Sequence, residues 1–550
     1  MSVTTKLERN VFVKPDGDYT CRLYPKVGYL HQATDMIMKS FDLTKDEAKC
    51  YVKDILADSV NHSPKVTYIG QDIYGDSVNK FTDLDSYMKK NIAEGNVIVP
   101  SFTVYTNPKV KSSVHTGYVL GNLKGRTEEK NLYKQALANK DMDRAAYHNV
   151  LQKVMKVFNN SLSGAYASKS TILYHPSSHY TLTSMTRAVA SVGNAITEMI
   201  VMGNRHYTST DRIIAHMTSL VVNIDQEKVS KAVTKYELYV PTNEELLKIL
   251  KYSSDLYYID LVGEVRIKKY ISGLSSTEKC TIAYTNDLYQ LREHNGKLVR
   301  YLLKGLGTPY HNNLDQTTET LDSAPEWLST LTHMVCSDVI KGQKVNYKKL
   351  LGTEAFKMLT GTTERIIKTL DLFEELITAF FVTPILPIDI VDIKNLTRRA
   401  IVISDTDSTC GSYVNYTEWY LGSKVVNKHA TGITGAVMTI VTQTMDHYLK
   451  QISANMNIKG DKMSMLQMKN EYYWETVVAP LASKQYYAGI NIKEGYVYDT
   501  PDLEIKGPIF IASNIPFRYK NRAKEIYIEI IDNISKNKKI DLASYIGEVA

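Results

Sequence analysis

Residues 401–413 read IVISDTDSTCGSY, and this stretch decides the fold class that the sequence predicts. An apolar, β-branched run ends at two carboxylates, Asp405 and Asp407, after which small residues lead into a second strand-like segment. This pattern is typical of a β-hairpin. Alternation along an extended chain places Asp405 and Asp407 on one face, where both can bind hard divalent cations. Taken alone, the same residues also fit an ordinary Asp-rich turn without any chemistry.

A pair of helices is predicted upstream of this hairpin. The periodicity of residues 116–158 indicates two antiparallel helices that are joined near residue 140. Arg126 and Lys130 are four residues apart on the first helix, and Lys156 and Asn160 are four apart on the second, so each pair shares one helix face. By themselves, such pairs are typical of a solvated helix surface.

Three motifs follow one another in a specific order along the chain. They are Lys-x-x-x-Asn-Ser-x-x-Gly at 156–164, Asp-Thr-Asp-Ser at 405–408 and Lys-x-Tyr at 484–486. In this joint occurrence the chain resembles the family B DNA polymerases, and it is closest to the divergent, sometimes divided polymerases of giant tailed bacteriophages. The resemblance covers about 112–205 and 396–535, so it extends well beyond the motifs.

The resemblance implies a template-directed DNA polymerase that transfers nucleotides from dNTPs to a primer 3′-hydroxyl. In such an enzyme, Asp405 and Asp407 of the palm hold two Mg²⁺ ions, for which Mn²⁺ can substitute. Primer-template DNA and dNTPs are the implied partners, and the cytoplasm of an infected bacterial cell is the implied location. Two alternatives stay open: a non-catalytic, polymerase-like subunit that binds nucleic acid or partner chains, and an RNA-synthesising or protein-primed relative.

The resemblance also implies two further groups of site residues. The group that faces the triphosphate of the incoming nucleotide, and aligns it through charge-assisted hydrogen bonds, comprises Arg126, Lys130, Lys156 and Asn160. The group that contacts the primer strand comprises Lys484, Tyr486, Tyr487 and Lys506. The doubled tyrosine leaves open whether Tyr486 or Tyr487 matches the family motif.

The chain departs from the family pattern at two places. Ser163 stands where the family has a Tyr that packs beneath the nascent base pair, so either Tyr166 takes its place or the pocket is built differently. The family's other metal-binding segment, Asp-x-x-Ser-Leu-Tyr-Pro, is not intact, because in residues 18–25 Asp18 lies one residue too far from Leu-Tyr-Pro. Either Asp18 serves in a modified turn, or a companion polymerase or exonuclease chain supplies the carboxylate. We expect a companion chain, since exonuclease acids and a full thumb are also missing.

The predicted fold class is α+β, with a family B polymerase-like palm of antiparallel sheet and helices, helical fingers and a mostly helical inserted domain. The predicted domains are an N-terminal palm-associated region at 1–110, the fingers helices and following palm helix at 111–205, the inserted domain at 206–395, the palm with its acid hairpin at 396–502 and the start of the thumb at 503–550. Helices predicted inside the insertion lie at 243–252, 288–303 and 355–372.

Composition is consistent with this prediction and excludes other classes. A chain of 550 residues with 43% hydrophobic content can bury more than one core. Its five cysteines are scattered without a Cys-x-x-Cys pair, which indicates a reducing compartment and no zinc site. The most apolar stretch, 376–390, is short and interrupted by prolines and an aspartate, so no membrane partner is expected. The net charge of +7 permits a polyanionic partner without requiring one.

Overall fold

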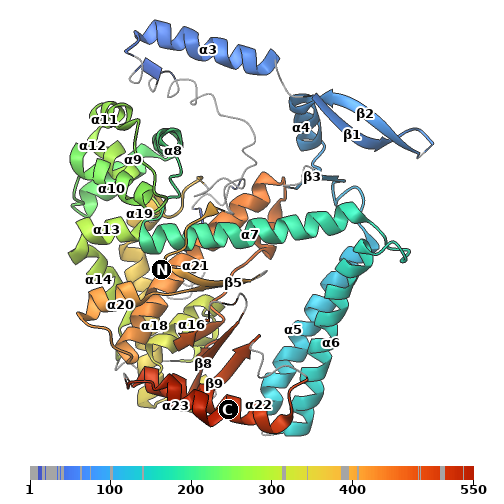
Figure 1. The fold of residues 1–550 in the computed structure, drawn as a ribbon, viewed down its shortest axis with the longest axis vertical. Helices are drawn as coiled ribbons and strands as arrows, with labels where there is room; N and C mark the ends of the chain where they lie inside the picture. Colours follow the sequence, from blue (N-terminus) through green and yellow to red (C-terminus); the bar gives the residue numbers. More distant parts are fainter. Residues whose placement is uncertain are drawn as a thin grey trace. The chain divides into compact units, whose positions relative to one another are not determined.

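The protein is largely helical and carries several small antiparallel sheets (Figure 1). A computed structural model describes residues 10–14, 19, 34, 37–38, 42–61, 65–74, 76–99, 103–138, 141–312, 317–343, 345–385, 395–405, 408–480, 482, 485–507, 514–536 and 538–549. The chain forms two compact units. The smaller unit comprises residues 19–189 and 450–465, and the larger comprises 1–18, 190–449 and 466–550. The mixture of helices and antiparallel strands agrees with the predicted α+β class.

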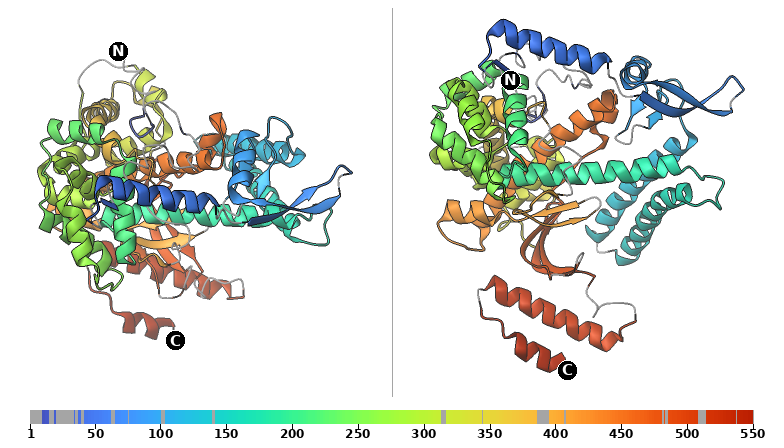
Figure 2. Two further views of the ribbon diagram at one scale, coloured as in Figure 1. Left: turned by 90° about the horizontal axis from the view of Figure 1, so that it is seen from above. Right: turned by 45° about the horizontal axis from the view of Figure 1, so that its top comes forward.

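The smaller unit contains two hairpins of strands and a pair of long helices. Its elements are α3 (Lys45–Asn61), β1 (Lys65–Gln71), β2 (Ser77–Asp83), α4 (Leu84–Ala93), β3 (Val97–Ile98), β4 (Val104–Tyr105), α5 (Val114–Ala138), α6 (Met142–Ala167), the first half of α7 (Pro176–Met202) and the 3₁₀ helix η2 (Gly460–Met465). Helices α5 and α6 lie side by side and antiparallel (Figures 1 and 2), as the sequence predicts. Asp141 begins α6, because its carboxylate accepts a hydrogen bond from the backbone N–H of Arg144.

After residues 1–18, the larger unit continues with the second half of α7 and a run of helices. These are α8 (Thr210–Asn223), α9 (Gln226–Lys235), α10 (Asn243–Asp255), α11 (Glu264–Ser272), α12 (Ser276–Tyr284), α13 (Leu288–His294), α14 (Gly296–Gly307), α15 (Glu319–Asp322), α16 (Glu326–Val335), α17 (Tyr347–Leu350), α18 (Glu354–Leu372) and α19 (Glu374–Phe380). The described part of 206–395 is therefore helical, as expected. The helix predicted over 288–303 is wrong in one respect, because Asn295 breaks it and accepts a hydrogen bond from the Tyr239 N–H at 2.8 Å.

Strands and long helices complete the larger unit. They are β5 (Ile401–Asp405), β6 (Ser408–Gly411), α20 (Val414–Leu421), α21 (Lys428–Asn455), β7 (Tyr472–Val478), β8 (Tyr486–Lys493), β9 (Tyr496–Lys506), α22 (Phe517–Ser535) and α23 (Leu542–Val549). Helix α21 ends in the smaller unit. Strands β5 and β6 pair with each other, whereas β7, β8 and β9 form a three-stranded antiparallel sheet on which α22 packs (Figure 2).

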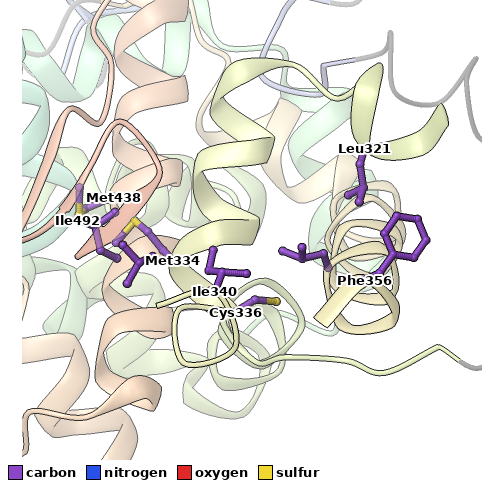
Figure 3. Close-up of a cluster of buried hydrophobic side chains, with 9 residues drawn as sticks. Leu321, Met334, Cys336, Ile340, Phe356, Met438 and Ile492 are labelled. Carbon is purple, nitrogen blue, oxygen red and sulfur yellow. The ribbon is translucent and has the colours of Figure 1, made fainter. Parts of the chain in front are cut away.

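A shared hydrophobic core joins the predicted insertion to the sheet. Figure 3 shows part of this core, in which Met334, Cys336 and Phe356 from the insertion belong to the same buried cluster as Met438 of α21 and Ile492 of β8. Helix α14 also touches α21 at the backbone, since a Cβ at Gly432 would lie 2.2 Å from the Gly307 carbonyl oxygen. The two compact units divide the chain inside α7 and α21.

Candidate active site

The acid hairpin exists where the sequence predicts it. Strands β5 and β6 pair antiparallel, with Ser404 opposite Thr409 and Asp405 opposite Ser408 at the end of the ladder. Asp405 is half-buried. Thr406 and Asp407 connect the two strands and lie outside the described residues, as does Asp18. The structure thus places one of the two predicted metal-binding carboxylates at the tip of a paired hairpin.

Helix α7 holds this hairpin through one amide side chain. Asn194 Nδ2 donates a hydrogen bond to Ser404 Oγ at 3.0 Å, and the Thr409 hydroxyl donates to Asn194 Oδ1 at 2.8 Å. Ser404 and Thr409 lie opposite each other on the two strands. The Asn194 amide therefore binds both members of this cross-strand pair, one through its NH₂ group and the other through its oxygen. Ser404 directly precedes Asp405, so this contact lies next to the acid.

One turn further along α7, Glu198 binds the segment that leads into β5. Its carboxylate is fully buried and accepts hydrogen bonds from the backbone N–H groups of Arg399 (2.8 Å), Ala400 (2.7 Å) and Ile401 (2.7 Å). A buried carboxylate is costly unless hydrogen bonds replace its water, and three consecutive amides do so here. Glu198 thereby fixes the start of the strand whose end carries Asp405.

Strand β8 carries the tyrosines predicted to contact the primer. Tyr486 is buried, and its hydroxyl donates to Glu504 Oε1 at 3.1 Å. Burial raises the pKa of Tyr486, with Glu504 the next cause, so the phenol stays protonated at neutral pH. Burial also raises the pKa of the Cys410 thiol, on strand β6 of the hairpin, to about 11, so this thiol stays protonated and unreactive.

The remaining predicted primer contacts lie around Tyr486. Tyr487 is partly exposed and stacks on Tyr527 of α22, with ring centroids 4.3 Å apart. Lys506 is exposed and pairs with Tyr486 across β8 and β9, with its Nζ 5.9 Å from the Tyr486 ring centroid. Lys484 lies outside the described residues. Of the two tyrosines, Tyr487 therefore has the more accessible ring.

The predicted triphosphate-binding residues lie on the paired helices α5 and α6. Two contacts fix the register of the pair: Asn122 Nδ2 donates to Asn159 Oδ1 at 3.0 Å, and His148 Nδ1 lies 2.6 Å from Glu129 Oε2. Arg126 lies between these two contacts along α5, and Lys156 lies between them along α6. Along the common direction of the two helices, the two residues are therefore within one helical turn of each other.

The four residues differ in exposure. Arg126 and Lys130 are half-buried. Lys156 and Asn160 are exposed, although they are neighbours in sequence of residues of α6 that face α5. Arg126 Nε is a buried donor with no hydrogen-bond partner in the described part of the chain. The helix pair therefore presents cations from both members and one donor that lacks an acceptor.

Ser163, which stands where the family has a tyrosine, contacts the next helix. Ser163 Oγ lies 3.2 Å from His179 Nδ1 of α7, and this contact closes the end of α6 against the start of α7. Tyr166 packs edge-on against His115 at a centroid distance of 5.6 Å. Ser163 is thus a structural contact within the smaller unit rather than part of an aromatic wall.

One family relationship decides the class of the chain. The sequence model described as "Divergent Family B DNA polymerase" matches residues 14–550. The chain belongs to this family. No curated protein and no solved structure is detectably similar to it.

Membership confirms the resemblance that the three ordered motifs indicate. For this divergent family B polymerase it supports a polymerase-related function of the nucleotidyltransferase kind, with DNA and nucleotides as ligands. Within the described residues, no group of three or more His, Cys, Asp or Glu side chains is arranged to hold a metal ion. None of the helices in the described ranges combines the length and the hydropathy that a membrane crossing requires.

The sequence interpretation missed Asn194 and Glu198 of this polymerase. Glu198 did leave a signal, because it is the one charge within the apolar run 195–202, AITEMIVM, of a predicted helix. A charge on a helix face that buries its neighbours needs partners from elsewhere in the fold. Asn194 left no comparable signal, since an asparagine is common on helix surfaces.

Proposed function

We propose that this family B polymerase extends a DNA primer along a template by transferring nucleotides from dNTPs to the primer 3′-hydroxyl. The observation that supports this most is the acid hairpin. Asp405 stands at the end of a paired ladder, with Asp407 two residues further along the chain. Carboxylate oxygens are the ligands that hard divalent cations prefer. The donors at this tip therefore fit the metal ions that nucleotidyl transfer requires.

Asp405 and Asp407 would hold two Mg²⁺ ions, or Mn²⁺ in their place. When bound, such ions lower the pKa of the attacking hydroxyl and neutralise charge on the triphosphate. The contribution of the chain itself is positional: the β5–β6 ladder, Asn194 and Glu198 fix the strand that leads to Asp405 and the residues that pair with it. A fixed carboxylate does not have to be reorganised during the reaction.

The α5–α6 pair would bind the triphosphate of the incoming nucleotide. Arg126, Lys130 and Lys156 supply three cations, and Asn160 supplies an amide donor. The buried Nε of Arg126 supports this role, since a phosphate oxygen would provide the acceptor that the described chain does not. The positive groups would align the α-phosphate and stabilise the pyrophosphate as it leaves.

Strands β8 and β9 would carry the primer strand. Lys484 and Lys506 would contact phosphates. Tyr486, which is buried and bonded to Glu504, lies on the same face of the sheet as Lys506 and would support this lysine rather than reach the DNA with its ring face. Tyr487 lies on the opposite face, where it stacks on Tyr527 of α22. These contacts are independent of base sequence, as a polymerase needs.

Primer extension tests the proposal directly. The chain is incubated with a 5′-labelled primer-template, Mg²⁺ and one dNTP at a time, and products are resolved on a denaturing gel. We expect incorporation only of the dNTP that is complementary to the template base. Tight primer-template binding without incorporation, with either Mg²⁺ or Mn²⁺ and with a companion chain present, would instead identify a non-catalytic subunit.

The triphosphate assignment gives a second expected result. Lys156→Ala should lower kcat/KM for the incoming dNTP by about 10² because a charge that acts in the transition state is lost. Primer-template affinity should stay unchanged. Lys153→Ala is the matched control, since it removes the same charge from an exposed position on the same helix. Single-turnover incorporation at several dNTP and primer-template concentrations gives both constants. A Lys156 variant with weakened DNA binding but normal nucleotide kinetics would assign this residue to DNA binding instead of triphosphate binding.

We also propose that a companion chain completes the metal site. No intact Asp-x-x-Ser-Leu-Tyr-Pro segment accompanies Asp405 and Asp407, and two carboxylates offer few oxygens for two octahedral ions. A protein from the same genome that carries this segment should raise primer extension by about 100-fold or more and form a stable complex by size-exclusion chromatography. Efficient synthesis by the purified chain alone, lost in Asp18→Ala, would assign the third carboxylate to Asp18.

A further inference from the structure

Two polar side chains of α7 are placed to control the acid hairpin rather than only to support the fold. Asn194 and Glu198 are one helical turn apart, so they project from the same face of α7. Asn194 bonds to Ser404 and Thr409, and Glu198 bonds to the backbone of 399–401. Together they contact the hairpin at its strand entry and immediately below its tip.

The position of the Asn194 contacts is informative. Ser404 and Thr409 form one cross-strand pair, and the Asp-Thr-Asp-Ser segment 405–408 lies entirely between them. A two-stranded ribbon is only marginally stable by itself, and its strands can shift or twist against each other. An amide that bonds both members of the last pair below the acids removes this freedom where it would displace the carboxylates.

Glu198 fixes the other end of the same strand. Its three bonds to consecutive backbone N–H groups set the rotation of the chain as it enters β5, immediately before the register irregularity between Ile401 and Ile403. Asn204 supports this arrangement, because its Nδ2 donates to the Thr397 carbonyl oxygen at 2.6 Å and to Glu198 Oε2 at 3.3 Å. Register errors of one residue would reverse the face on which Asp405 lies.

We propose that Asn194 and Glu198 are positioning residues of the polymerase site, which set the placement of Asp405 for divalent cation binding. This inference rests on the proposed function of the hairpin. Neither residue is proposed to touch a substrate. Asn194 is the better residue to test, since Glu198 is fully buried and its substitution can prevent folding.

Three variants separate positioning from a structural role. Asn194→Leu keeps a similar volume and removes both hairpin contacts. Asn194→Asp keeps them, because a carboxylate can accept from both hydroxyls once Ser404 Oγ acts as the donor. Thr197→Val is the matched control on the same helix, since the Thr197 hydroxyl is buried and its one hydrogen bond within the described part of the chain goes to the Gly193 carbonyl oxygen of α7 itself.

We expect Asn194→Leu to weaken Mn²⁺ binding, followed by electron paramagnetic resonance, by about tenfold or more. It should lower kcat for incorporation by about 10- to 100-fold, while KM for dNTP and primer-template affinity stay within about twofold. Hydrogen exchange of peptide 401–411 should become faster. Asn194→Asp should restore slow exchange, and Thr197→Val should match the wild type in all five measurements.

The outcomes distinguish this inference from the proposed function. A wild-type chain that binds Mn²⁺ in an Asp405-dependent way, together with an Asn194→Leu variant that matches it in exchange, Mn²⁺ affinity and kcat, would overturn the positioning role alone. A wild-type chain that neither binds Mn²⁺ nor incorporates nucleotides with a companion present would overturn the proposed function, and the inference with it.

Discussion

Replacing Asp407 or Asp405 by alanine should lower the rate of nucleotide incorporation by about 10³-fold. Each carboxylate is proposed to hold metal ions that stabilise charge in the transition state, a contribution of several kcal/mol, and each 1.4 kcal/mol corresponds to about a tenfold change in rate. The variants are compared with the wild type in single-turnover primer extension, under whichever conditions, with or without a companion chain, support extension by the wild type.

Two controls make this result specific. Primer-template affinity of both variants should stay near that of the wild type, because neither acid is expected to contact DNA directly. Glu244→Ala, which removes an exposed carboxylate from α10, should leave incorporation unchanged. Extension by the Asp407 variant within a few-fold of the wild-type rate would show that the hairpin is not the catalytic palm element.

Asp287→Asn should destabilise the larger unit by about 3 to 5 kcal/mol. Arg205 and Asp287 form a fully buried ion pair, with Arg205 Nη2 2.8 Å and Nε 3.0 Å from Asp287 Oδ2. The guanidinium also donates to the backbone carbonyl oxygens of Ile282 and Ala283, so it is tied into its site. Loss of the negative charge leaves a buried cation without compensation. Urea unfolding followed by tryptophan fluorescence measures the change.

A second ion pair in the same unit provides the control for this measurement. Arg266 Nη1 lies 3.2 Å from Asp211 Oδ1, but the two side chains are 53% and 82% exposed, respectively. Solvent screens such a pair, so Asp211→Asn should change the free energy of unfolding by less than about 1 kcal/mol. Equal effects of the two substitutions would mean that Arg205 reaches solvent or another partner when Asp287 loses its charge.

The sequence predicts elements that are determined by local chemistry. Helices α5 and α6 follow from their periodicity and from Asp141, which caps α6. The hairpin of β5 and β6 follows from a β-branched run that ends at small and acidic residues. The break at Asn295 coincides with the dipeptide Asn295-Gly296, a local turn signal that the prediction of one helix over 288–303 did not use, and the bond from the Tyr239 N–H holds the Asn295 side chain there.

The parts of the candidate site that sequence reasoning missed depend on distant segments. Asn194 and Glu198 acquire their roles only when residues 399–409 are placed beside α7, which no local pattern encodes. The same holds for the insertion. Its helices were predictable from their amphipathic faces, but the core that Cys336 and Phe356 share with Ile492 of β8 was not.

The bonds between Glu198 and Arg399 also have a consequence for biosynthesis. The two residues are 201 positions apart, so closing this loop costs about 5 kcal/mol of chain entropy before any contact stabilises it. At the usual rate of translation, Glu198 is made about 10 to 40 s before its backbone partners. During this interval its carboxylate must stay hydrated, and the end of α7 cannot become buried. The acid hairpin should therefore be among the last parts of the nascent chain to reach its final conformation, after most of the helices that surround it.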